Sequence, residues 1–261
     1  MFDSIDPSMV GTSTAILVFA GILSFLWLGR RLGRAALERL SGLPGTESLE
    51  TAVFALLGLL IAFTFSGAVE RFDARRIQVV NEANAIGTAY LRIELLPASV
   101  QAPLRDKFRQ YADARIGAYR KLPDLKAARS ELERSQGLQA EIWSLAVVAV
   151  RSPDSAAGTN VLVLPALNEM FDVATVRLAA TQMHPPAIIF LMLVGLAFAS
   201  ALLAGYRSSG DKAHGWLHQL GFASIVAFTV FVILDMEYPR LGFIRVDAID
   251  EVLVGVRAGM K

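Results

Sequence analysis

Four long runs of uncharged, mostly apolar residues alternate with charged segments along the chain. The runs contain 23, 19, 29 and 22 residues without Asp, Glu, Lys or Arg. They extend over Pro7–Gly29, Thr51–Val69, Leu178–Tyr206 and Ala213–Leu234. Since a helix needs about 20 apolar residues to cross a bilayer core of about 30 Å, each run predicts one membrane-spanning helix. Asp3 and Asp6 replace the basic start of a signal peptide and Arg30 follows the run, so we expect the first helix to be retained.

The spans are paired, with two before and two after a long polar segment. Residues 70–96 contain one glycine and no proline, so we expect the second helix to continue past the bilayer until Pro97 stops it. His184-Pro185-Pro186 interrupts the chain before the third span. Helical spacing and proline positions predict three more helices in the polar segment: Val100–Leu122, Leu125–Arg151 capped by Asp124, and one opened by Pro165 that runs to Thr181.

These patterns predict an all-α integral membrane protein with four transmembrane helices, the long second helix extending into a helical extramembrane domain. No alternating strand pattern of any length occurs in the sequence. We expect transmembrane helices 1 and 2 in residues 1–69 and the helical extramembrane domain in 70–184. Transmembrane helices 3 and 4 are expected in 185–234, and a C-terminal extramembrane tail in 235–261.

Composition supports a membrane protein and narrows the functional classes. Hydrophobic residues make up 54% of the chain and charged residues 19%, with a mean hydropathy of +0.48, which is unlike an ordinary soluble enzyme. The 25 Lys and Arg against 24 Asp and Glu leave a net charge of +1, so no nucleic-acid partner is expected. The chain has no cysteine, which excludes thiol catalysis and cysteine metal sites.

Two polar clusters were considered as chemical sites. His214 and His218 have a spacing that lets two imidazoles meet one metal, but no third ligand joins them. Asn168, Glu169 and Asp172 share one helical turn, yet nothing near them supplies a nucleophile. We therefore expect no enzyme, no metal site and no cofactor.

The distribution of basic residues favours one orientation in the membrane. The two short connections between paired spans hold six Lys and Arg residues, while the opposite side holds eight spread over roughly 70 residues. By the positive-inside rule, the short connections face the cytoplasm, and the termini and the large segment face outward.

The stretch from Gly58 to Arg76, GLLIAFTFSGAVERFDARR, carries a family resemblance. An apolar helix with a small-aromatic step, Ala62-Phe63, leads after eight residues into Arg71-Phe72-x-x-x-Arg76, and this resembles the second helix of bestrophins. After the fourth span, Asp235-Met-Glu237-Tyr-Pro239-Arg-Leu-Gly242 is similar to the acidic–Pro–Gly pattern that follows the last bestrophin helix. The phrases FTFSGAVERFDARR, EANAIGTAYLR and LDMEYPRLG look more closely like a bacterial family described as bestrophin-like.

The resemblance implies a multi-pass protein of the bacterial plasma (inner) membrane that forms a homo-oligomer, five-fold if it follows bestrophins. The second helix would line a pore for small inorganic ions, and the bilayer would be the only other partner. Bestrophins keep their termini and large helical part in the cytoplasm, opposite to the charge count, so the sidedness of the large domain stays open.

One stripe of the second helix would then face the pore axis. Taking every third or fourth residue from the motif gives Ala55, Leu59, Phe63, Ser66, Glu70, Asp73, Ile77, Asn81 and Asn84. Ala55, Leu59 and Phe63 would form an apolar neck that gates by expelling water. Ser66, Glu70 and Asp73 would form a hydroxyl ring and two carboxylate rings that favour cations.

Other interpretations of these residues remain open. The apolar stripe can be a packing face, and Gly58, Ala62 and Ser66 form a row of small residues suited to close helix contact. The charged residues from Glu70 to Arg76 can be a solvated turn at the membrane surface, and Asp235 and Glu237 can be anchors of the fourth span. The alternative function is a non-conducting membrane scaffold or sensor that acts through its extramembrane helices.

Overall fold

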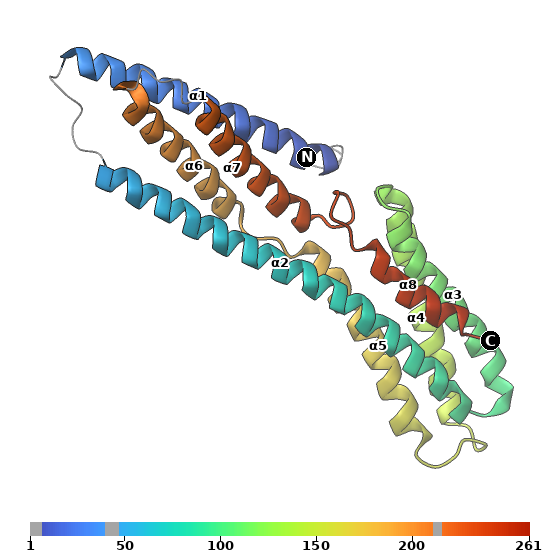
Figure 1. Ribbon diagram of the computed structural model, residues 1–261. Helices are drawn as coiled ribbons and strands as arrows, with labels where there is room; N and C mark the ends of the chain where they lie inside the picture. Colours follow the sequence, from blue (N-terminus) through green and yellow to red (C-terminus); the bar gives the residue numbers. More distant parts are fainter. Residues whose placement is uncertain (1–6, 40–46, 211–215) are drawn as a thin grey trace. The chain divides into compact units, whose positions relative to one another are not determined.

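A computed structural model describes residues 7–39, 47–210 and 216–261, and every regular element in these residues is a helix (Figure 1). The α-helices are α1 Pro7–Arg39, α2 Glu47–Leu91, α3 Ala98–Arg120, α4 Leu125–Val150, α5 Thr159–Gln182, α6 Ala187–Arg207, α7 Trp216–Glu237 and α8 Asp250–Ala258. Short 3₁₀ turns occupy Arg92–Leu95, Ser208–Gly210 and Asp247–Ile249.

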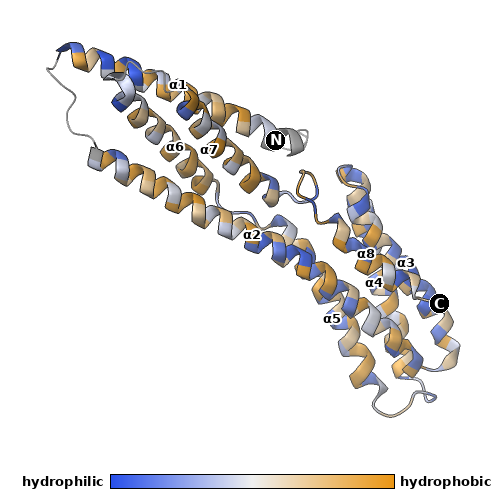
Figure 2. Ribbon diagram, viewed as in Figure 1, coloured by the Kyte–Doolittle hydropathy of each residue, from blue (hydrophilic) through white to orange (hydrophobic). Residues whose placement is uncertain are grey.

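The prediction of an all-α protein with four spans is confirmed. Helices α1, α2, α6 and α7 contain stretches long and apolar enough to cross a membrane. Figure 2 shows hydrophobic residues dominating α6, α7 and the first half of α2, whereas α3 and α4 mix both kinds. The third uncharged run, Leu178–Tyr206, is divided between two helices, because α5 ends at Gln182 and Pro186 is the N-cap of α6.

Helix α2 is one unbroken helix of 45 residues, but it ends earlier than predicted. After Leu91 the chain tightens into the 3₁₀ turn, and Leu96 is extended with φ −87° and ψ 160°. Proline disfavours the α conformation in the residue before it, so Leu96 has to leave the helix ahead of Pro97, which becomes the N-cap of α3. The tail also contains α8, an element that the sequence analysis did not predict.

The extramembrane helices agree with the prediction except at one boundary. Asp124 caps α4 as expected, its carboxylate accepting a hydrogen bond from the backbone N–H of Ala127 at 3.0 Å. The prediction that Pro165 opens the next helix was wrong, since α5 begins at Thr159 and Pro165 lies inside it. Gly158, with φ 84°, makes the turn that starts α5, and this left-handed conformation suits glycine.

The chain divides into two compact units. Unit 1 comprises Met1–Arg71 and His184–Tyr238, and unit 2 comprises Phe72–Met183 and Pro239–Lys261. The C-terminal residues 239–261 belong to the same unit as the helices of residues 72–183.

In unit 1, α1 and α6 pack with their backbones in contact. A Cβ atom on Gly29 of α1 would overlap the carbonyl oxygen of Leu202, and one on Gly205 of α6 would overlap the carbonyl oxygen of Leu26. A Cβ atom on Gly21 would overlap the ring of Phe198. Residues later in α1 therefore contact residues later in α6, so the two helices run parallel. Small residues at such positions let membrane helices approach closely.

In unit 2, a hydrophobic core joins α2, α3, α4, α5 and α8. Phe108 and Tyr111 of α3 are its largest fully buried side chains. The ring of Phe108 meets that of Tyr90 of α2 edge-on, with centroids 5.9 Å apart. Arg257 of α8 pairs with Asp113 of α3 through two hydrogen bonds of 2.8 and 2.9 Å, which fastens the C-terminal helix to this core.

Replacing Gly29 or Gly205 with alanine should destabilise the membrane helices, because each added methyl group would meet a backbone oxygen that cannot rotate away. We expect a loss of about 1–3 kcal/mol, seen as a lower melting temperature of the purified protein in detergent. Gly195→Ala on α6 is the matched control, since a Cβ there has nothing within 4 Å. Equal melting temperatures for all three variants would contradict the close α1–α6 contact.

Candidate functional site

The stripe predicted to face a pore lies on the exposed side of α2. All nine of its residues are exposed in the single chain: Ala55, Leu59, Phe63, Ser66, Glu70, Asp73, Ile77, Asn81 and Asn84. Leu59 and Phe63, the proposed neck, have 52% and 68% of their surface exposed. This face is therefore open to lipid, to solvent or to a second copy of the chain.

The row of small residues on α2 is exposed as well. Gly58, Ala62 and Ser66 all lie on the open side of the helix, and a Cβ on Gly58 would have nothing within 4 Å. Close helix contact within the chain is instead made between α1 and α6, at glycines that the sequence analysis did not single out.

The arginines that follow the apolar part of α2 have three different partners. Arg71 pairs with Glu237, and Arg76 donates to Asp73 at 3.1 Å on the surface, with its guanidinium 6.0 Å from the ring of Phe72. Arg75, which the motif comparison did not mark, is buried and donates to the carbonyl oxygens of Ala180 and Met183 at 3.1 and 2.9 Å. It thereby caps the C-terminal carbonyls of α5.

Two motif segments far apart in the sequence meet at Glu237. Arg71 donates to its Oε1 through Nε at 2.9 Å and Nη2 at 2.5 Å, and the carboxylate side chain is only 1% exposed. His184 places Nδ1 3.5 Å from Oε2, and its ring stacks on Tyr238 with centroids 4.7 Å apart. The motif of α2 and the motif after α7 therefore form one cluster in unit 1.

The remaining motif residues shape the chain after the fourth span. Asp235 is buried in the last turns of α7. Pro239 accepts a hydrogen bond from the backbone N–H of Val246 at 3.1 Å, which closes a loop, and Gly242 lies half-buried within that loop.

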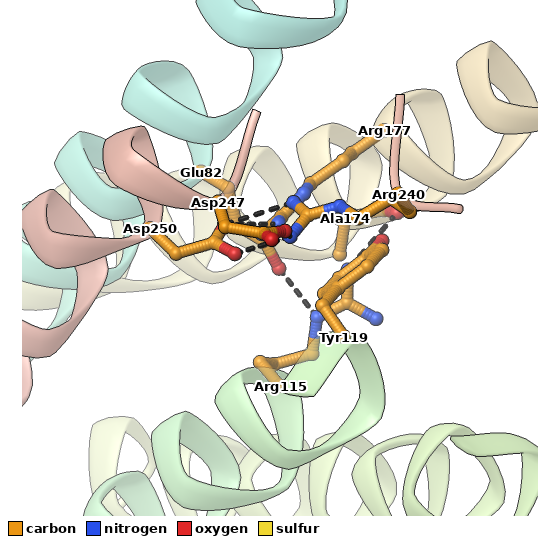
Figure 3. A network of polar contacts seen from close by, with 8 residues as sticks. All are labelled: Glu82, Arg115, Tyr119, Ala174, Arg177, Arg240, Asp247 and Asp250. Atoms are coloured by element: carbon orange, nitrogen blue, oxygen red, sulfur yellow. Dashed lines mark hydrogen bonds and ion pairs between the residues drawn. The ribbon is translucent and has the colours of Figure 1, made fainter. Parts of the chain in front are cut away.

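Unit 2 contains a buried network of charged side chains (Figure 3). Glu82 of α2 accepts hydrogen bonds from Arg115 of α3 at Oε1 and from Arg177 of α5 at Oε2, the latter at 2.5 Å. The three side chains are 0%, 4% and 3% exposed. One carboxylate thus connects three helices.

The C-terminal segment extends this network. Asp250 of α8 accepts from Arg177 at 3.1 Å and from Arg240 at 2.9 Å, and Arg240 also reaches Asp247 at 3.1 Å. The ring of Tyr119 lies among the guanidinium groups, 3.8 Å from that of Arg177 and 4.8 Å from that of Arg240. Three arginines thus face three carboxylates, and Asp247 also pairs with Arg245 at the surface.

The electrostatics of the network keep Arg115 charged. Burial alone would lower the pKa of Arg115, but the charge of Glu82, the nearby Tyr119 and Tyr111 and the hydrogen bond to Glu82 together outweigh it, so the pKa of Arg115 lies above its ordinary value. Burial also raises the pKa of Tyr111 to about 12, so its phenol stays neutral and accepts a hydrogen bond from Gln139 at 3.2 Å.

This network was not predicted from the sequence, although the sequence contains a signal for it. Glu82 stands on the apolar face of α2 formed by Val79, Ala83, Ile86 and Ala89, where a lone carboxylate is costly. Arg115 interrupts the apolar face of α3 in the same way. A charge on the buried face of a helix predicts a buried partner, but it does not say which one.

No metal site appears among the described residues, where no three His, Cys, Asp or Glu side chains are grouped as ligands. His218 is exposed, and its proposed companion His214 lies outside the described residues.

Comparison with known proteins identifies a family. The family model described as the Bestrophin-like domain matches residues 16–249, which include all of α2 to α7. No curated protein and no solved structure matches the chain. The predicted resemblance to a bestrophin-like family is therefore confirmed.

Replacing Glu82 with glutamine should strongly destabilise unit 2, because Arg115 and Arg177 would lose the carboxylate that neutralises them. Breaking a buried ion pair typically costs about 3–5 kcal/mol, and the expected loss is of that order. Chemical unfolding measures it, followed by the fluorescence of Trp143 in a background in which Trp27 and Trp216 are replaced by phenylalanine. Glu133→Gln on the exposed face of α4 is the control and should change stability by no more than about 0.5 kcal/mol. Equal stability of the two variants would contradict the role given to Glu82.

Proposed function

We propose, from the premise that the chain belongs to the bestrophin-like family, that this multi-pass membrane protein is a homo-oligomeric ion channel whose pore is lined by α2. Its substrates are small inorganic ions, and its partners are the lipid bilayer and further copies of the chain, five in all if assembly follows bestrophins. The proposed role involves no catalysis and no cofactor. The proposed location is the bacterial plasma membrane.

The exposed stripe of α2 is the observation that carries this proposal. In the apolar stretch of α2, 11% of residues are buried, against 22% in α1 and 28% in α7. Helix α2 is thus the span least covered by its own chain. Its open face is also more than a lipid-facing surface, because the same face continues from Leu59 and Phe63 into Ser66, Glu70 and Asp73. An apolar segment followed by hydroxyl and carboxylate groups suits a water-filled path better than lipid.

The neck would act as the gate. When several copies of Leu59 and Phe63 surround an axis, the narrow apolar constriction loses its water, and an ion that cannot shed its hydration shell does not pass. Widening the constriction or adding polar groups to it restores water and conduction.

The carboxylate rings of Glu70 and Asp73 would set the preference for cations over anions, and the two rings would contribute unequally. Asp73 already pairs with Arg76, which offsets its charge. Within the described residues Glu70 has no ion pair, so its carboxylate contributes its full charge to the path. We therefore assign the cation preference chiefly to Glu70.

Phe63→Ala should increase ion flux several-fold in liposomes that contain the purified protein, because the smaller side chain admits water to the neck. Phe65→Ala is the matched control, since Phe65 is an exposed phenylalanine of α2 that lies off the stripe. Flux of K⁺ and Cl⁻ should be measured beside a check of the oligomer by size-exclusion chromatography with light scattering. No flux in either variant from an intact oligomer would favour the scaffold or sensor function instead.

Glu70→Gln should lower the preference for K⁺ over Cl⁻, and adding Asp73→Asn should lower it further because Arg76 is then released from its partner. The reversal potential in a KCl gradient at low ionic strength measures this preference, since salt screens such charges. Glu133→Gln serves as the control. A preference that the double substitution leaves unchanged would show that these residues do not face the ion path.

A further inference from the structure

A groove on the surface of unit 2 lies between α2 and α5. Its volume is about 390 Å³, within the usual range of small-molecule sites of about 300–1,000 Å³. Ala85 and Ala166 line it, and their short side chains leave the space open. Its polar lining consists of Asn81, Asn84, Thr88, Arg92 and Glu169.

The two helices run antiparallel, which fixes where the polar groups stand along the groove. Arg177 of α5 pairs with Glu82, and Arg92 donates to the carbonyl oxygen of Leu162 at 2.6 Å. Glu169 lies midway between Leu162 and Arg177 and is therefore level with the middle of the groove, near Thr88. Arg92, the first residue of the 3₁₀ turn that follows α2, lies four residues beyond Thr88, a backbone rise of about 6 Å by helix geometry.

Several polar side chains in the groove lack a partner within the chain. Among the described residues, Asn81, Asn84 and Glu169 make no side-chain hydrogen bond or ion pair. Asparagine is a poor residue for a helix interior, because its amide competes with the backbone, and α2 carries two on this one face. Asn81, Asn84 and Glu169 are exposed in the single chain, so their polar groups are open to a ligand that enters the groove.

The charges in the groove select the class of ligand. Glu169 is negative, and Arg92 is positive with only one of its five N–H donors used on Leu162. Arg92 would repel a simple cation at Glu169, and Glu169 would repel a simple anion at Arg92. A ligand that carries both charges satisfies both residues.

We infer that this groove binds a small zwitterion of the amino-acid type. Its ammonium group pairs with Glu169, its carboxylate pairs with Arg92, and the amides of Asn81 and Asn84 and the hydroxyl of Thr88 bind its polar atoms. The inference concerns binding alone and holds whether or not the protein conducts ions.

The test compares L-alanine with two analogues of nearly the same shape. Isopropylamine replaces its carboxylate with a methyl group, and isobutyrate replaces its ammonium with a methyl group. Isothermal titration calorimetry of the full-length protein in detergent should detect binding of L-alanine and of neither analogue. Absence of L-alanine binding to the wild-type protein would overturn the inference.

Glu169→Gln supplies the decisive variant. Losing a charged hydrogen bond should weaken L-alanine binding about tenfold or more. Isobutyrate should now bind, because the carboxylate that repelled it is gone. This gain is a result that a merely structural role of Glu169 would not produce. Unchanged binding of L-alanine to this variant would also overturn the inference.

Two further variants complete the set. Asp172→Asn is the matched control, because Asp172 is exposed on the next turn of α5 and does not line the groove, so L-alanine binding should stay as in the wild type. The Arg92→Gln variant should no longer bind L-alanine and should bind isopropylamine. Because Arg92 also donates a hydrogen bond to the carbonyl oxygen of Leu162, the melting temperature of the Arg92→Gln variant is measured first. If that variant does not fold, the result for Glu169→Gln alone decides whether the inference stands.

Discussion

The carboxylate of Glu82, held between Arg115 and Arg177, is the interaction on which the arrangement of the extramembrane helices depends. A buried carboxylate costs several kcal/mol unless it is paired, so α2, α3 and α5 must keep the register that brings both guanidinium groups to it. This pairing also sets the rotation of α2 about its own axis. Asn81 lies beside Glu82 on the open side, and Phe63 precedes Asn81 by 18 residues, which is five turns at 3.6 residues a turn. Phe63 and Asn81 therefore share one face of the helix, and the inward position of Glu82 keeps Asn81 on the exposed side of unit 2.

Local signals in the sequence were enough to predict most of the helices, but not the polar contacts between them. The spans follow from uncharged runs, and Asp124 follows from the capping preference of helices, both of which act over a few residues. The stripe taken from the motif lies on the exposed side of α2 in the single chain, as helical periodicity requires of residues three or four apart, and its position at a pore stays a prediction. The partners of Glu82 could not be found by such reasoning, because Arg115 and Arg177 lie 33 and 95 residues away in the sequence.

The start of α5 was predicted wrongly for a different reason. Pro165 lies inside α5, and the left-handed Gly158 before Thr159, not the proline, marks the start of the helix.

Unit 2 is built from two separate segments of the chain, and this restricts how the chain crosses the membrane. Residues 72–183 and 239–261 belong to one compact unit, so both must lie on the same side of the bilayer. The chain between them has to cross an even number of times, and α6 and α7 supply two crossings. The parallel packing of α1 and α6 agrees with this, because the first and third of four successive spans run in the same direction. The pairing of spans deduced from charge-free runs thus has an independent basis in the packing.

The discontinuity of unit 2 also dictates the order in which the protein can mature during synthesis. Asp250 leaves the ribosome 73 residues after Arg177, and α6 and α7 are made in between. At about 5–20 residues per second, Arg177 waits seconds for its second carboxylate while the last two spans enter the membrane. The extramembrane helices can close their charge network only after all four spans have been delivered. A nascent chain that fails to insert its last span keeps α8 on the wrong side of the bilayer, and its unfinished network distinguishes it from a correctly inserted protein.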